Sequence, residues 1–137
     1  MDDQIAQWKA AGENGDVHAA LNALSPDAEL VSPLTDQFVF RGREATGQLL
    51  AGVFTTLDDF TYTSDLRQAD AAVLTATSRA SGVALHETQH LEIDRSGTIS
   101  RLTVSIRPLP ALTCLDRLAA TGDKRFVPMA APPQERR

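Results

Sequence analysis

The stretch AVLTATSRASGVALHETQHLEI, residues 72–93, decides the fold of this chain. Apolar and polar side chains alternate through both of its halves, which is typical of β-strands that bury one face. Ser81 and Gly82 separate the halves and suit the two-residue turn of a hairpin. The stretch therefore predicts two neighbouring antiparallel strands with one apolar face.

The segments on either side of this hairpin place helices first and strands after them. A wide apolar stripe makes the helix over residues 45–57 the clearest of the helices. In chain order we predict two short helices near residues 5–12 and 17–24 (the second capped by Asp16), strands at 28–32 and 38–42, the helix at 45–57, a strand at 60–66, the hairpin, a strand at 98–109, and a final helix from Pro110 that Gly122 stops. This order predicts an α+β fold in which helices pack on one face of a strongly curved, mostly antiparallel sheet.

Composition limits the classes of function. The 137 residues, 42% of them hydrophobic, fit a single domain with one core. A net charge of -5, with no Lys and Arg cluster before the last few residues, argues against nucleic-acid binding. Cys114 is the single cysteine, and the start MDDQIAQW lacks the apolar core of a signal peptide, so we expect a cytoplasmic location. No run approaches the roughly 18 apolar residues of a membrane helix, so we expect no membrane insertion.

Five short motifs, taken in order, resemble the nuclear transport factor 2-like superfamily and in particular its bacterial SnoaL-like members, the polyketide cyclase and ketosteroid isomerase-like family. They are GD before the second helix, PDAEL, GREA, DRSGTI and RPLPAL. The resemblance implies a SnoaL-like domain over residues 3–122, shaped as a cone whose sheet and helices enclose an apolar pocket, followed by an irregular tail at 123–137. It also implies dimers that form through the outer sheet face.

The members of this superfamily include ketosteroid isomerases, polyketide cyclases, epoxide hydrolases, dehydratases and non-catalytic binding domains, so the fold leaves the reaction open. Laid on the steroid isomerases, Trp8 takes the place of their oxyanion-stabilising tyrosine and Ser32 that of their general-base aspartate. Gln89 takes the place of their second oxyanion donor, a protonated aspartate. A serine without a partner is no base near neutral pH, so we do not expect steroid isomerisation by that route.

The alternation of strand 83–93 provides a separate argument about the pocket. Glu87 and Gln89 interrupt its apolar face, and Leu102, Val104 and Ile106 of the following strand face the same interior. Burial there would raise the pKa of a carboxyl group and suit it to general acid or base work. The alternative is that Glu87 lies near the cavity mouth or pairs with an arginine.

We therefore predict Glu87 as the proton-transfer group, with Gln89 beside it in the catalytic set. The predicted ligand-positioning residues are Trp8, Ser32, Phe54, Tyr62, Leu91, Leu102 and Val104. Simpler roles stay open for several of them. Gln89 could be a core amide, Ser32 the end of a strand before Pro33, and Trp8 a wall rather than a catalyst, while the role of Tyr62 depends on the register of its strand.

The histidines suggest no metal site. His86 and His90 lie on one strand face about 13 Å apart, too far to share a zinc ion, and the sequence implies no cofactor. Their polar face, which also carries Thr75, Thr77 and Thr103, predicts either exposed sheet or a subunit interface.

The resemblance implies a homodimer, and together with the inward-facing polar residues it predicts a protein that binds a small hydrophobic organic ligand. We expect cofactor-independent acid/base catalysis, such as isomerisation, cyclisation, dehydration or epoxide opening, on a polyketide- or terpene-like compound of secondary metabolism. The alternative is a non-catalytic ligand-binding or dimerisation domain.

Overall fold

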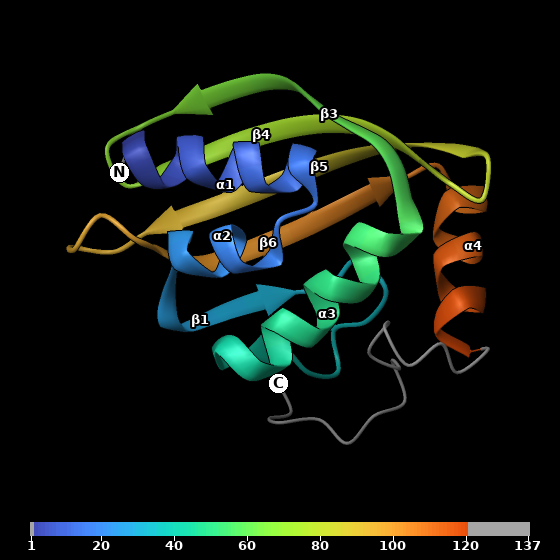
Figure 1. The fold of residues 1–137 in the computed structure, drawn as a ribbon, viewed down its shortest axis with the longest axis horizontal. Coiled ribbons are helices and arrows are strands. Elements are labelled where there is room, and N and C mark those ends of the chain that lie inside the picture. Colours follow the sequence, from blue (N-terminus) through green and yellow to red (C-terminus); the bar gives the residue numbers. More distant parts are fainter. Residues whose placement is uncertain (1, 121–137) are drawn as a thin grey trace.

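The computed structural model describes residues 2–120, which form four helices and a six-stranded sheet (Figure 1). The elements are α1 (Asp2–Asn14), α2 (Val17–Ala23), β1 (Leu24–Val31), β2 (Phe40–Arg41), α3 (Gly42–Thr56), β3 (Leu57–Arg67), β4 (Ala71–Ala80), β5 (Val83–Ile93), β6 (Ile99–Arg107) and α4 (Leu109–Ala120). The order matches the one predicted. The predicted helix stop at Gly122 and the predicted tail at 123–137 lie outside the described residues.

The β4–β5 hairpin forms as its alternation predicted. The strands pair in register from Ala71 opposite Glu92 to Ala80 opposite Val83. Ser81 and Gly82 both have positive φ, 50° and 80°. Such values are required in a two-residue hairpin turn whose twist matches that of the flanking strands.

The sheet has the strand order β2-β1-β6-β5-β4-β3 and is not closed. All neighbours are antiparallel except β1 and β6, which run parallel. The first strand begins at Leu24, earlier than the predicted residue 28. Leu24 pairs with Ile99, and the register then shifts before Glu29 pairs with Arg101, so the segment containing Pro26 is accommodated as a bulge.

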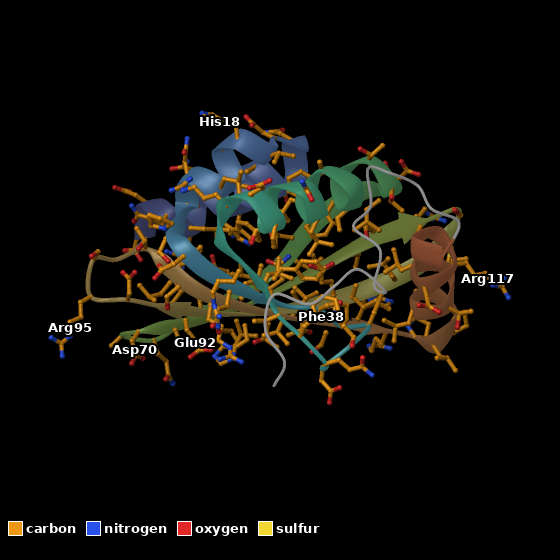
Figure 2. The ribbon with its side chains drawn as sticks, turned by 90° about the horizontal axis from the view of Figure 1, so that it is seen from below. His18, Phe38, Asp70, Glu92, Arg95 and Arg117 are labelled. Atoms are coloured by element: carbon orange, nitrogen blue, oxygen red, sulfur yellow. The ribbon has the colours of Figure 1, made fainter. Side chains whose placement is uncertain are left out.

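Helices α1, α2 and α3 cover one face of the sheet, and α4 packs at one end of it against β4, β5 and β6 (Figure 1). Figure 2 shows this arrangement from the side, with His18 of α2 pointing away from the sheet. The Asp16 side chain accepts a hydrogen bond from the Ala19 N–H at 3.0 Å, which confirms the predicted cap of α2. These features confirm the α+β prediction. None of the described helices is long and apolar enough to cross a membrane.

The apolar core lies between the helices and the sheet in two clusters. The larger one contains Ile5, Leu74 and Ile99, all fully buried, while the smaller one joins Leu85 to Leu115 under α4. Members of both clusters line one cavity, so the site lies where the two meet.

Candidate functional site

An apolar cavity opens between the inner face of the sheet and helices α1, α3 and α4. The cavity volume is about 80 Å³. The empty space around it, counted out to the open solvent, is about 750 Å³. Its walls are Trp8, Gly12, Leu30, Ser32, Pro33, Leu34, Leu49, Leu50, Val53, Phe54, Leu57, Phe60, Tyr62, Glu87, Gln89, Leu102, Val104, Ile106 and Leu115. A few polar groups in a largely apolar wall are the usual make-up of a site for a small organic ligand.

The polar groups of the cavity form one hydrogen-bonded network centred on Gln89. The Trp8 indole N–H of α1 donates to Gln89 Oε1 at 2.8 Å, and the Tyr62 hydroxyl of β3 donates to the same oxygen at 2.9 Å. Gln89 Nε2 in turn donates to Glu87 Oε2 at 2.5 Å. Three elements that are distant in sequence thus converge on two neighbouring inward positions of β5.

Trp8 fixes the orientation of this network. An indole nitrogen can only donate, so the Gln89 atom that faces it must be the carbonyl oxygen. The amide nitrogen then points to Glu87, where a donor stabilises a carboxylate. Gln89 therefore links the two ring donors to the acid through its carbonyl oxygen and one of its two amide hydrogens.

Glu87 is a buried carboxyl group whose pKa is raised to about 7. Burial is the main cause, since a charge in apolar surroundings loses its hydration, and the hydrogen bond from Gln89 acts in the opposite direction. The side chains opposite it on the adjacent strands are those of Ala76 and Ile106. None of the ion pairs among residues 2–120 involves Glu87, so the predicted alternative of an arginine partner is not what the described structure contains.

Tyr62 is held against the cavity by the end of α1. Its backbone N–H donates to Glu13 at 2.9 Å, at a point where β3 bulges away from regular pairing with β4. A Cβ on Gly12 would lie 3.2 Å from the Tyr62 hydroxyl oxygen, so a glycine lets the ring approach the helix. Burial, and after it the charge of Glu87, raises the pKa of Tyr62, which keeps the hydroxyl a donor.

The other predicted site residues divide into two groups. Ser32, Phe54, Leu102 and Val104 line the cavity. Ser32 directly follows strand β1, and its hydroxyl oxygen accepts a hydrogen bond from the Leu34 N–H at 3.0 Å, which confirms the turn role, while its contact with a ligand stays a prediction. Leu91 is fully buried in the larger core cluster and is not among the lining residues.

The outer face of the sheet carries two of the histidines and several threonines. His86 and His90 are exposed there and do not approach the cavity. Among residues 2–120, no group of three or more His, Cys, Asp or Glu side chains is placed to hold a metal ion.

Sequence reasoning missed several parts of the site. Gly12 and Glu13 carry no pattern that points to Tyr62, because the contact joins a helix to a strand bulge. Phe60 could have been found, since it precedes Tyr62 by two residues in an alternating strand and therefore shares its face.

Comparisons with known proteins identify the fold. No protein-family model and no curated protein sequence matches the chain. The structure of a steroid delta-isomerase from Pseudomonas aeruginosa matches with 26% identity over 88% of this chain and 92% of that chain, at a TM-score of 0.77. A bacterial protein with a cystatin-like fold from Silicibacter pomeroyi matches at a TM-score of 0.81, with 18% identity over 90% of this chain and 89% of that chain.

A third match, TerC, was co-crystallised with polyporic acid. It has 18% identity over 81% of this chain and 96% of that chain, at a TM-score of 0.67. Proteins described as nuclear transport factor 2-like, ketosteroid isomerase-like and polyketide cyclase also match over most of their length. The chain therefore has the nuclear transport factor 2-like fold and resembles the isomerase-like and cyclase-like proteins of that superfamily.

Proposed function

We propose that the chain binds a small hydrophobic organic molecule in this cavity and moves a proton to or from it through Glu87. The observation that carries the proposal is a single buried carboxyl group, with a pKa near neutral, in an otherwise apolar cavity. A proton-transfer group works best when its pKa lies near the working pH. Ligand-bound neighbours such as TerC support small-molecule binding in this fold.

In this proposal the residues have separate tasks. Glu87 takes a proton from a carbon or oxygen of the ligand and returns it elsewhere, as isomerisation, cyclisation, dehydration or epoxide opening requires. Gln89 stabilises the carboxylate form and, held by Trp8 and Tyr62, keeps it in one orientation. The apolar walls exclude water, which strengthens each polar contact. A polyketide- or terpene-like compound would suit such walls.

The route differs from that of the steroid isomerases. Ser32 stands where the resemblance places their base, and its oxygen already accepts from the Leu34 N–H. The ring donors, Trp8 and Tyr62, point at Gln89 and not into an open oxyanion site. The proton-transfer group therefore lies on β5, at a different place in the cavity.

Solvent exchange tests this proposal without a known substrate. A panel of hydrophobic carbonyl compounds is incubated with the protein in deuterated water, and deuterium incorporation at carbon is followed by NMR. We expect exchange that rises as pH passes through about 7 and that is lost in Glu87→Gln. Glu92→Gln is the matched control, since Glu92 lies on the same strand but faces outward.

The outcomes separate the alternatives. Exchange that persists in Glu87→Gln would exclude Glu87 as the proton-transfer group. Binding without exchange would favour a non-catalytic ligand-binding protein. One observation favours that second candidate, namely that both ring donors are already used by Gln89 and so leave no ready site for an oxyanion.

We also propose a homodimer that forms through the outer sheet face. That face is rich in uncharged hydroxyl side chains, with Thr75 hydrogen-bonded to Thr63 at 2.8 Å, and it exposes Leu66 to 69%. Sedimentation equilibrium tests the proposal. A Thr88→Arg substitution in the centre of the face should shift a dimer to monomer, and a monomeric wild type would refute it.

A further inference from the structure

Within the part of the chain that the structure describes, the charged residues that line the cavity and an adjoining hollow are all acidic. Among these described residues, Glu87 is the only charged one that lines the cavity itself. A second, more open hollow shares Gly12, Phe54, Leu57 and Phe60 with the cavity and is also lined by Glu13, Asn14, Gly15, Asp59 and Thr61. Among residues 2–120, no Lys, Arg or His belongs to either lining.

The two ring donors of the cavity are already engaged. The Trp8 N–H and the Tyr62 O–H both donate to Gln89 Oε1, so neither is available to a negatively charged ligand group. The Glu87 carboxyl group accepts one bond from Gln89 through Oε2, and no hydrogen bond to its second oxygen joins it to another described residue. The second Glu87 oxygen is therefore an unused acceptor in the cavity, while the Ser32 hydroxyl, whose oxygen accepts from Leu34, is a neutral donor there.

The walls add a second attraction for positive charge. Four aromatic rings line the cavity, those of Trp8, Phe54, Phe60 and Tyr62. Aromatic faces attract ammonium groups, and the attraction grows when both partners are removed from water. The apolar remainder of the wall suits the hydrocarbon part of the same molecule.

Two cations of α1 and β3 are paired with Asp65, and one of them, Lys9, also lies over the Tyr62 ring with its Nζ 5.9 Å from the ring centroid. Lys9 of α1 lies 3.1 Å from Asp65, and Arg67 pairs with the same carboxylate at 2.8 Å. The groups that face Glu87 from the adjacent strands β4 and β6 are the side chains of Ala76 and Ile106, which carry no charge. Tyr62 from β3 stays protonated, because burial raises its pKa.

We propose that the cavity takes a hydrophobic organic cation, a protonated amine or a quaternary ammonium compound, with its positive end against Glu87. This inference rests on the proposed function, because it concerns the same cavity, and it specifies the charge of the ligand. A cation would compensate the buried carboxylate directly, whereas a carboxylate, sulfonate or phosphate would meet like charge without a counter-ion.

Three ligands of nearly the same shape and different charge test the inference. They are para-(hydroxymethyl)phenyltrimethylammonium, para-tert-butylbenzyl alcohol and para-(hydroxymethyl)benzenesulfonate, measured by calorimetry against the full chain from about pH 5 to about pH 9. The charge of each is constant over this range, so any change with pH comes from the protein. We expect the cation to bind about tenfold more tightly than the neutral alcohol at the upper end, and the sulfonate not to bind.

Two variants give the origin of this preference. In Glu87→Gln the cation should lose most of its advantage and all of its pH dependence, and the aromatic rings account for what remains. The alcohol should keep its affinity, and Glu92→Gln should behave as wild type. Asp59→Asn removes a charge from the adjoining hollow and should fold, since Asn tolerates the left-handed φ of 58° found there. It should weaken binding of the cation about twofold at low salt and leave the alcohol unaffected.

The outcomes distinguish this inference from the proposed function. If the alcohol binds as tightly as the cation at every pH, the inference is wrong, while Glu87 can still transfer protons on neutral ligands. If none of the three binds, the cavity is not a ligand site and both proposals fail.

Discussion

Replacing Glu87 by Gln should make the protein more stable at alkaline pH, and the size of the effect follows from the burial of the acid. The folded pKa of Glu87 is about 7 against an ordinary value of 4.5. Below the lower value the carboxyl group is protonated in both the folded and the unfolded chain. Between the two values the unfolded chain releases the proton while the folded chain retains it, so the free energy of unfolding falls as pH rises.

The difference between these pKa values corresponds to about 3 kcal/mol of unfolding free energy, lost between about pH 4.5 and about pH 7 and constant above that. A glutamine at this position keeps the shape and can accept the hydrogen bond from Gln89, but it carries no charge. The variant should therefore equal wild type near pH 4.5 and exceed its stability by about 3 kcal/mol at pH 8.

Urea denaturation at a series of pH values, followed by the fluorescence of the single Trp8, measures this difference. Other titrating groups cancel, because only the gap between wild type and variant is compared. Glu92→Gln, on the exposed face of the same strand, should change the unfolding free energy by less than about 1 kcal/mol at any pH. A gap between wild type and Glu87→Gln that stays constant with pH would refute the placement of Glu87 in the apolar interior.

Three further substitutions test the supports of the site. Trp8→Phe removes one of the two donors to Gln89 and should lower the unfolding free energy by about 2 kcal/mol in urea denaturation followed by circular dichroism, whereas an unchanged value would mean that this bond contributes little. Gly12→Ala places a Cβ 3.2 Å from the Tyr62 hydroxyl oxygen and should lower the unfolding free energy by about 1 kcal/mol. It should also alter the ring resonances of Tyr62 in NMR spectra, and unaltered resonances would contradict the close approach. Asp16→Ala removes the cap of α2 and should lower the unfolding free energy by about 1 kcal/mol, measured by thermal unfolding. An unchanged unfolding free energy would mean that water replaces the cap.

Much of the fold followed from local patterns. The alternation of residues 83–93 placed Glu87 and Gln89 on the buried face, and the structure places both there, at 6% and 3% exposure. The strand start near residue 28 was wrong by four residues, because Pro26 suggests a break while β6 supplies pairing partners on both sides of it. Leu91 shares the face of Gln89, but alternation cannot tell the wall of a cavity from the filled core beside it.

The sequence by itself determined which side chains face inward, because direction in a strand alternates with every residue and needs no knowledge of the partner. Only the tertiary structure decided what those side chains meet. Gln89 contacts Trp8 from 81 residues away and Tyr62 from 27 residues away. The register of β3 and the approach of α1 set those contacts, and the depth of burial that they create gives Glu87 its near-neutral pKa.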